Sequence, residues 1–430
     1  MRAATVNKFK HILRGGVVNS QMTSLSDGKN SEKSDRQVMG ALILTHMAQH
    51  LFSGASILYQ NIREDLNLSY TQIGVMVGIA SILGGFLQMV YSVASRWVPR
   101  RLLLAGSNLA LSIGCVFTGI ANSFEAVITG NAVTGVGQAG THPVSSSIIS
   151  SRFEKKRVGS SLSLFYGLGF IGNIISPILL SVVAVAAGWR SAYYLLALVF
   201  LATGLIAFFG LRGEPAADKV VSKESRGKFL NDVKAALRVK GAVPILVAQA
   251  FISGGTGMGV MTTWIPVYLR DASKGLGLTV GFAGIISSLA TIGGVLGTIY
   301  LGRVADRFGY LKTASISLAI TTTTIFFLTL YQGYNIILIP HLFILSMTTF
   351  SMSSLLQAQL AYNSTSEERD ILLGIYFTFG FGVSSLWSTL LGALVDNYSF
   401  NAVWLTMVGA GVAALTCLIF GARRQNSPQG

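Results

Sequence analysis

Long apolar blocks alternate with short polar breaks along almost the whole chain. Each block has about 20 residues, the length that a helix needs to cross the hydrocarbon core of a bilayer. The breaks are rich in Lys, Arg, Asn, Gly and Pro. The pattern predicts an all-α membrane protein with twelve transmembrane helices in a lipid bilayer, near residues 38–60, 71–94, 102–122, 125–150, 158–185, 190–211, 243–269, 278–301, 313–332, 335–361, 371–394 and 400–421.

One long polar segment, residues 212–240, interrupts this pattern with a run of Lys, Glu, Asp and Ser. We interpret it as a linker between two bundles of six helices each, at residues 38–211 and 241–421. Residues 1–37 form a basic tail before the first span, and residues 422–430 form a short tail after the last.

A repeated polar motif indicates that the two bundles are related by pseudo-symmetry. GRVADRFGYLK, at residues 302–312, recurs in degraded form 211 residues earlier as YSVASRWVPRR, at residues 91–101, and both copies read as short loops between spans. A second pair of polar segments places Arg157 opposite Arg369 at a separation of 212 residues. Internal duplication is typical of secondary transporters, which bind substrate near the membrane midplane between the repeats.

The distribution of charge predicts the orientation of the chain. Only 11% of the residues are charged, the mean hydropathy is +0.59 and the net charge is +15. In a soluble protein such a net charge would suggest nucleic acid as a partner, but here it follows the membrane topology. All Lys and Arg residues except Arg63, Arg190, Arg270 and Lys274 fall in the tails, the linker and alternate loops. By the positive-inside rule both termini are cytoplasmic, and we expect no nucleic-acid partner.

The first 26 residues contain Arg2, Lys8, Lys10 and Arg14 and no acidic residue. This composition resembles an organellar transit peptide. A basic tail before a first span satisfies the same orientation rule, so both interpretations stay open.

The motif GRVADRFGYLK fits the loop signature G-x-x-x-D-R-x-G-x-x-K/R between spans eight and nine of the major facilitator superfamily. Over roughly residues 38–421 the chain resembles that family. The resemblance implies two pseudo-symmetric six-helix bundles and transport by alternating access, without enzymatic catalysis. It also implies that this loop latches the cytoplasmic ends of the two halves together.

Within the predicted latch, Gly302 and Gly309 permit a close helix approach and a turn. Asp306 can pair with a neighbouring arginine or with a helix N-terminus. In the first copy Ser95 replaces the acid, which predicts a weaker contact. Alternatively, basic residues such as Arg303 and Lys312 only fix the orientation. The predicted latch residues are Arg96, Gly302, Asp306, Arg307, Gly309 and Arg369.

The predicted spans contain no charged side chain near their middle: all 17 acidic residues and all Lys and Arg fall in loops or at helix ends. Proton-coupled carriers commonly use a buried carboxylate as the relay, and carriers of anions need a compensating positive charge. The pattern therefore favours a neutral or amphipathic substrate, unless Arg63 or Arg190 reaches inward.

Histidines are the remaining titratable groups of the spans. His46 and His50 on span one lie four residues apart and share a helical face, and His142 lies on span four. Because the ordinary pKa of histidine is near 6.5, we predict that these three residues are candidates for a proton relay. The alternative is a role in interhelical hydrogen bonding. Metal binding is disfavoured because no third ligand follows the pair at a fixed spacing.

Polar and aromatic side chains on the spans are candidates for the substrate site, since small-molecule sites are mostly apolar with a few directional polar groups. Interhelical hydrogen bonds could equally occupy any of the amides. The predicted substrate-binding residues are His46, His50, Gln138, His142, Tyr166, Asn173, Gln249, Trp264, Gln357 and Tyr376.

Two stretches, residues 45–76 and 135–153, resemble the fosmidomycin-resistance branch of drug-efflux carriers within this superfamily, although Val144 replaces the acid that the branch tends to place after its His-Pro pair. The chain contains no P-loop, so we expect no cofactor and an ion or solute gradient as the energy source.

We therefore predict a monomeric antiporter of the cell membrane or inner membrane that exports a small neutral or amphipathic compound, with protons as the coupling ion. Two alternatives stay open. One is an uptake carrier for a metabolite such as an organic acid or a sugar, and the other is a sensor or scaffold with a carrier fold.

Overall fold

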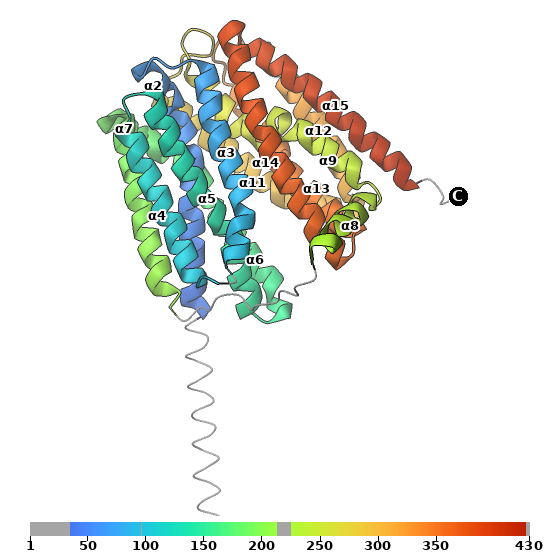
Figure 1. Ribbon diagram of the computed structural model, residues 1–430. Helices are drawn as coiled ribbons and strands as arrows, with labels where there is room; N and C mark the ends of the chain where they lie inside the picture. Colours follow the sequence, from blue (N-terminus) through green and yellow to red (C-terminus); the bar gives the residue numbers. More distant parts are fainter. Residues whose placement is uncertain (1–34, 96, 213–224, 427–430) are drawn as a thin grey trace, which may run out of the picture.

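The computed structural model describes residues 35–95, 97–212 and 225–426, and these ranges consist of helices joined by short turns (Figure 1). The first span (Asp35–Asp65) contains a 3-10 turn (Gly54–Leu58) and ends in α2 (Tyr59–Asp65). The rest of the N-terminal half consists of α3 (Tyr70–Ala94), α4 (Arg100–Gly119), α5 (Phe124–Arg152), α6 (Lys155–Gly169) and α7 (Ile171–Gly210).

The linker contributes α8 (Ser225–Arg238), which packs against the C-terminal half. That half begins with an interrupted span. It consists of α9 (Ala242–Phe251), two π-helical segments (Ile252–Thr256 and Val260–Trp264), α10 (Ile265–Arg270), α11 (Val280–Phe308), α12 (Tyr310–Leu328), α13 (Leu338–Asn363), α14 (Ser366–Asn397) and α15 (Phe400–Asn426).

Nine helices in the described ranges are long and apolar enough to cross a membrane. One of them covers two crossings, because α7 turns at Gly188, whose backbone has φ 83° and ψ 162°. The more polar α5 and the interrupted span α9–α10 complete twelve crossings. The predicted all-α fold with twelve transmembrane helices is therefore confirmed.

Capping residues set where several of these helices begin. The Ser69 side chain accepts a hydrogen bond from the Gln72 backbone N–H, and the Gln72 side chain accepts one from the Ser69 N–H, which closes a capping box at the start of α3. Thr365 and Glu368 form the same motif at the start of α14. Such caps satisfy N–H groups that have no partner within the helix.

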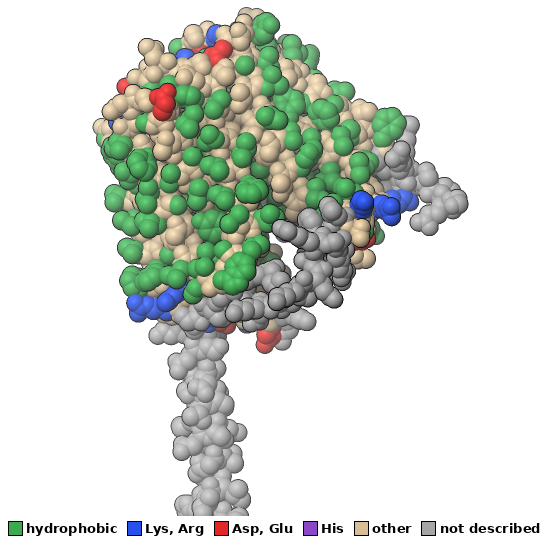
Figure 2. Space-filling model, viewed as in Figure 1, with side chains coloured by type: hydrophobic (Ala, Val, Ile, Leu, Met, Phe, Trp, Pro, Cys, Tyr) green, Lys and Arg blue, Asp and Glu red, His purple; other side chains and the backbone are tan. Residues whose placement is uncertain are grey.

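The outer surface fits a lipid environment. Hydrophobic side chains cover the side of the bundle, whereas Lys, Arg, Asp and Glu gather at its two ends (Figure 2). Large hydrophobic side chains are widely exposed; Val182 and Leu198, for example, are 59% and 65% exposed. An apolar belt of this kind is stable in hydrocarbon and not in water, so the protein is an integral membrane protein.

The two ends of the bundle differ, and we name them by what lies there. The terminal end carries Asp35, the start of α6 and the linker helix α8, and the distal end carries α2 and the start of α3 (Figure 1).

Two seams join the halves. In the first, α3 lies against α14 so closely that a Cβ atom at Gly74 would overlap the Ser388 carbonyl oxygen. In the second, α7 lies against α11, and a Cβ at Gly284 would overlap the Ser181 side chain. Small residues permit such close approach between membrane helices. The seams therefore depend on glycine at these positions.

The prediction of an eleven-residue loop at 302–312 is wrong. The helix α11 continues through Phe308 and α12 begins at Tyr310, so only Gly309, with φ 94°, lies between them. A helix can extend beyond the membrane, and a glycine with positive φ is enough to turn the chain. The earlier copy is more open, with α3 ending at Ala94 and α4 beginning at Arg100.

Candidate functional site

A cavity of about 310 Å³ lies mainly within the C-terminal half and reaches α3 of the N-terminal half through Val77 and Ser81. Of the predicted substrate-binding residues, Gln249, Trp264 and Tyr376 line it. None of the described residues that line the cavity is Asp, Glu, Lys, Arg or His. Its polar groups are hydroxyls and amides, and its aromatic rings provide apolar surface.

The interrupted seventh span forms one wall of this cavity. The sequence ISGGTGMG leaves the α-helical conformation after Phe251, and Gly257 is extended with φ −87° and ψ −166°. Gly254 packs directly on the Trp387 ring, and Trp387 Nε1 donates a hydrogen bond of 2.8 Å to the Ala250 carbonyl. Irregular backbone inside a membrane protein is stable where it is buried or lines a cavity.

One buried acceptor of the cavity lining is free for a ligand. Gln249 Oε1 has no hydrogen-bond partner among the described atoms. A buried polar atom without a partner costs stability, and a bound solute that donates a hydrogen bond would remove that cost for Gln249.

Gln357 lies behind the cavity wall. Its Nε2 donates a hydrogen bond of 2.8 Å to Ser353 Oγ, and the Tyr376 hydroxyl lies 3.4 Å from the same oxygen. Ser353 lines the cavity. Gln357 therefore orients a lining residue and is not itself part of the lining.

The three predicted relay histidines come together in the N-terminal half. The ring centroids of His46 and His50 are 4.5 Å apart, and His142 from α5 lies 5.0 Å from His46 and 6.3 Å from His50. Tyr166 from α6 stacks on His142 at 6.0 Å. His46 is completely buried. The spacing along the sequence identified the pair, and helix packing adds His142 and Tyr166.

Hydrogen bonds organise this cluster. His46 Nε2 and His50 Nε2 are 3.0 Å apart, and His46 Nδ1 lies 3.1 Å from the Phe165 carbonyl oxygen. Within the described ranges, no three His, Cys, Asp or Glu side chains are arranged to hold a metal ion. The contacts are those of hydrogen-bonded imidazoles.

A polar path leads from the histidines toward the cavity. Ser53 Oγ lies 2.7 Å from the His50 carbonyl oxygen and also donates to Asn173 Oδ1. Ser53 and Asn173 line a small void together with Thr262 and Phe350, and the last two also line the large cavity. Gln138, a predicted substrate-binding residue, has a contact through its backbone: its carbonyl accepts a hydrogen bond of 2.7 Å from Gln49 Nε2.

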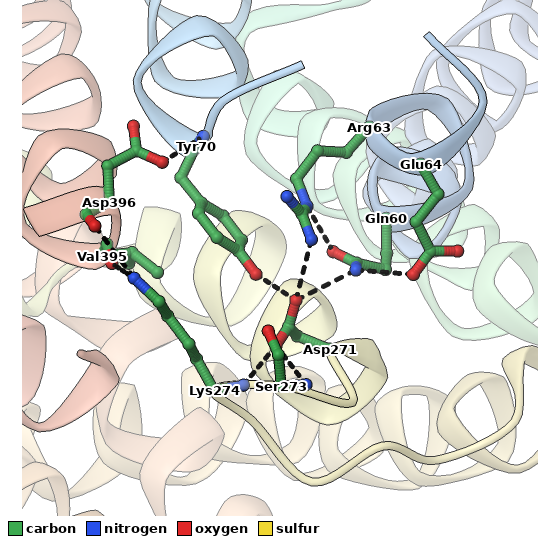
Figure 3. A network of polar contacts seen from close by, with 9 residues as sticks. All are labelled: Gln60, Arg63, Glu64, Tyr70, Asp271, Ser273, Lys274, Val395 and Asp396. Atoms are coloured by element: carbon green, nitrogen blue, oxygen red, sulfur yellow. Dashed lines mark hydrogen bonds and ion pairs between the residues drawn. The ribbon is translucent and has the colours of Figure 1, made fainter. Parts of the chain in front are cut away.

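At the distal end, Asp271 is the centre of a polar network between the halves (Figure 3). Its side chain is 1% exposed and accepts hydrogen bonds from Tyr70 Oη, from Gln60 Nε2 at 3.0 Å and from Arg63 Nη2 at 3.2 Å. Ser273, which follows it in the chain, donates through its backbone N–H and its hydroxyl, both at 2.9 Å.

Burial alone would raise the pKa of the Asp271 carboxyl, but the hydrogen bonds from Tyr70, Lys274 and Ser273 outweigh it and hold the pKa below its usual value. Hydrogen bonds to the charged form of a carboxyl have this effect. Asp271 therefore stays ionised and keeps its partners in mildly acidic solution.

A second carboxylate ties α14 to α3 beside this network. Asp396 accepts bonds from the backbone N–H groups of Tyr70 at 2.9 Å and Thr71 at 2.7 Å, at the N-terminus of α3. Lys274 Nζ in turn donates to the carbonyl groups of Val395 and Asp396, near the C-terminus of α14 (Figure 3). Both charges complement the helix dipoles.

Sequence reasoning missed this network because it treated Asp271 and Asp396 as ordinary loop acids. Gln60 lies within α2, whereas Asp271 directly follows the end of α10, and no motif in the sequence links the two positions.

Five of the six predicted latch residues lie at the terminal end, and among the described side chains none of them bonds to the opposite half. Asp306, Arg307 and Arg369 are exposed, and Asp306 accepts a bond of 2.7 Å from the Tyr310 hydroxyl of its own half. Nothing lies within 4 Å of a Cβ built on Gly302. Arg96 lies outside the described residues.

Two six-helix halves, an uncharged cavity and an interrupted helix beside it define the class of secondary transporters. The chain belongs to the Major Facilitator Superfamily, whose family profile matches residues 40–388 and 269–430. It is therefore a transport protein and not an enzyme.

Individual relatives are distant. The chain is 25% identical over 308 residues to the probable sulfoacetate transporter SauU of Cupriavidus necator, which covers 68% of this chain and 69% of that protein. It is 22% identical over 334 residues to the multidrug resistance protein MdtG of Escherichia coli, which covers 77% and 79%. The solved structure of the nucleoside transporter NupG superposes with a TM-score of 0.72 at 15% identity and covers 91% of this chain and all of that one. The narrower resemblance to the fosmidomycin-resistance branch stays a prediction.

Proposed function

We propose that this protein exports a small neutral or amphipathic organic compound in exchange for protons. The uncharged cavity is the observation that carries the proposal. Taking a charged solute out of water into a site without a compensating charge is costly, whereas hydroxyls, the free Gln249 oxygen and the Trp264 ring suit a solute with few polar groups. The volume of about 310 Å³ suits a small ligand.

The direction of transport is proposed from orientation and from one relative. The positive-inside rule places the terminal end in the cytoplasm, and the distal network then closes the outer side. This arrangement corresponds to an inward-facing carrier. The similarity to MdtG, a multidrug resistance protein, is in keeping with export from that state.

The two ends would then alternate. In the inward-facing state Asp271 and Asp396 hold the distal end together. In the outward-facing state these bonds break, and Asp306, Arg307 and Arg369 come together with the opposite half at the terminal end. We propose this as the role of the repeated motif.

The proposed coupling site is the histidine cluster. In the described spans it is a group of three titratable side chains connected to the cavity by Ser53, Asn173 and Thr262. An imidazole can bind and release a proton near neutral pH. The cluster can therefore take the role that a buried carboxylate has in other carriers.

A second candidate function is uptake of an organic anion together with a proton. It is favoured by one feature: a protonated histidine would place a positive charge beside the small void that adjoins the cavity. Sulfoacetate, the solute in the name of the probable transporter SauU, is an anion of this kind.

Flux measurements in proteoliposomes separate the two functions. The purified protein would be screened with labelled neutral, cationic and anionic solutes under an imposed pH gradient. The proposal expects saturable flux of neutral or amphipathic solutes against the proton gradient, and Gln249→Leu should reduce it about tenfold, because a hydrogen bond to the solute is lost. Flux confined to sulfonates and carboxylates, in the same direction as protons, would establish the second function instead.

A further inference from the structure

We infer that His50 binds the coupling proton at Nδ1, that His46 is the residue that positions it, and that the cluster carries one proton at a time. The inference rests on the proposed proton coupling and assigns it to one atom. It follows from the direction of two hydrogen bonds.

The first bond fixes the tautomer of His46. A backbone carbonyl can only accept, so the contact of 3.1 Å between His46 Nδ1 and the Phe165 oxygen requires a hydrogen on Nδ1. A neutral imidazole carries one N–H group. His46 Nε2 therefore has a free lone pair and is an acceptor.

The second bond then fixes the tautomer of His50. Its Nε2 lies 3.0 Å from His46 Nε2, and because that nitrogen is an acceptor, His50 Nε2 must be the donor. Neutral His50 consequently has its lone pair on Nδ1. The three groups form a chain of hydrogen bonds in which His50 donates to His46 and His46 donates to the Phe165 carbonyl.

Among the four ring nitrogens of His46 and His50, the incoming proton can bind without breaking either hydrogen bond only at His50 Nδ1. Both nitrogens of His46 are engaged. A proton from water forms a new N–H bond at His50 Nδ1 and makes the ring an imidazolium, and the same bond breaks on release. His46 Nε2 then accepts from a charged donor, which strengthens the bond.

The neighbours of His50 suit one positive charge. Asn173 from α7 interacts with its side chain, and Asn173 Nδ2 has no hydrogen-bond partner among the described atoms, whereas Asn173 Oδ1 accepts a bond from the Ser53 hydroxyl. An amide can present either its oxygen to a charged imidazole or its NH₂ group to a neutral one. The Phe170 ring stacks on His50 at 5.0 Å.

The titratable groups that face this pair from other elements are His142 on α5 and Tyr166 on α6, and in the described spans no carboxylate faces it. The Tyr166 hydroxyl is bonded to Ser146 at 3.2 Å. A second proton on His142 would place two positive charges on rings 6.3 Å apart in a poorly hydrated site. Their repulsion restricts the cluster to one proton.

A transport experiment with matched variants tests the assignment. Glutamine retains an N–H near the Nε2 position but cannot bind a proton, so His50→Gln should abolish flux driven by a pH gradient while solute counterflow persists. In His46→Asn the donor to Phe165 is retained and the acceptor for His50 is lost. Driven flux should persist with its midpoint shifted to lower pH by about one unit, the equivalent of one lost hydrogen bond.

His341→Gln is the control, because His341 lies in the other half, bonded to Tyr331 and Thr324, and should leave the driven flux unchanged. If the parent shows flux that ignores the pH gradient, the proton coupling itself is refuted. If the parent is coupled and His50→Gln stays coupled, the assignment alone is refuted. Loss of coupling in His142→Gln but not in His50→Gln would have the same meaning.

A spectroscopic measurement on the parent protein avoids any effect of substitution on folding. Nitrogen chemical shifts of ¹⁵N-histidine-labelled protein in lipid distinguish the two neutral tautomers. The inference expects His46 with its hydrogen on Nδ1 and His50 with its hydrogen on Nε2 at high pH. The same tautomer for both residues would overturn it.

Discussion

Both ends of this transporter carry charged side chains, but the two ends use them differently. At the distal end Asp271 and Asp396 each bind groups of the opposite half, through Arg63, Tyr70 and Thr71. At the terminal end Asp306 bonds within its own half, and Arg307 and Arg369 are exposed. The comparison shows that charged loop residues hold one end of a carrier closed only where a carboxylate accepts hydrogen bonds from donors of both halves.

The most direct test of this comparison is to remove the charge of Asp271, the centre of the distal network. Asp271→Asn keeps the size of the side chain but loses its ion pair with Arg63 and weakens its bond to Tyr70. Removing one partner of a buried charged pair costs roughly 3 kcal/mol or more, so the distal end should open at least tenfold more often. The rate at which an impermeant maleimide added outside labels Thr262→Cys would measure this, with Cys115 and Cys417 replaced.

Asp65→Asn is the matched control for Asp271→Asn. Asp65 pairs with Arg190, but both residues belong to the N-terminal half, so the pair joins nothing across the interface. The same labelling rate in Asp65→Asn as in the parent is expected. A rise equal to that of Asp271→Asn would show that any distal carboxylate affects opening.

The terminal end supplies the reciprocal test. If Asp306 forms a latch in the outward-facing state, Asp306→Asn should reduce turnover in a flux assay about tenfold, the effect of losing about 1.4 kcal/mol in one step of the cycle. Ser95→Ala, at the equivalent position of the first copy, should change turnover less than twofold because no charge is lost. Equal and mild effects of the two substitutions would contradict the latch.

Two glycines compare a tight contact between the halves, at Gly74, with an open position at the terminal end, Gly302. A Cβ at Gly74 would overlap the Ser388 backbone, so Gly74→Ala should lower stability by about 1–3 kcal/mol. Gly302 has open space, and Gly302→Ala should be neutral or stabilising by up to about 1 kcal/mol, since alanine favours helix. Thermal unfolding in detergent measures both. If Gly302→Ala impairs flux without lowering the unfolding temperature, another helix approaches Gly302 in the other state.

The smallest expected effect is that of pH on the distal end. Because the pKa of Asp271 lies below its usual value, its stabilising contribution is complete above the ordinary pKa near 3.9 and is lost only as the pH falls through the lower folded value. The labelling rate of Thr262→Cys, divided at each pH by that of a fully exposed cysteine to correct for thiol ionisation, should therefore be the same at pH 7.5 and pH 5. An increase at pH 5 would mean that protons open this end directly.

The sequence was enough to predict the fold, because apolar blocks of span length and a repeat with a fixed offset leave few alternatives. It did not reveal the break in the seventh span, since the glycines of ISGGTGMG lie inside an apolar block and hydropathy does not register them. The loop at 302–312 was misjudged for a related reason: polar residues mark where the membrane ends and not where a helix ends.

The candidate site was predicted only in part. Helical spacing placed His46 beside His50, but bringing His142 and Asn173 to them required the packing of two further helices, α5 and α7. Gln249, Trp264 and Tyr376 line the cavity, whereas Gln357 lies behind the lining residue Ser353. The distal network depends on which segments of the two halves meet at that end, and no motif in the sequence indicated it.

The central claim, that Asp271 holds the distal end closed, is tested most directly by a distance across that end. Spin labels at Asn67 and Tyr398, exposed residues of the two halves, would report it by double electron–electron resonance in lipid. The account predicts one short distance in the parent and an additional longer population in Asp271→Asn. Identical distance distributions in the two proteins would contradict it.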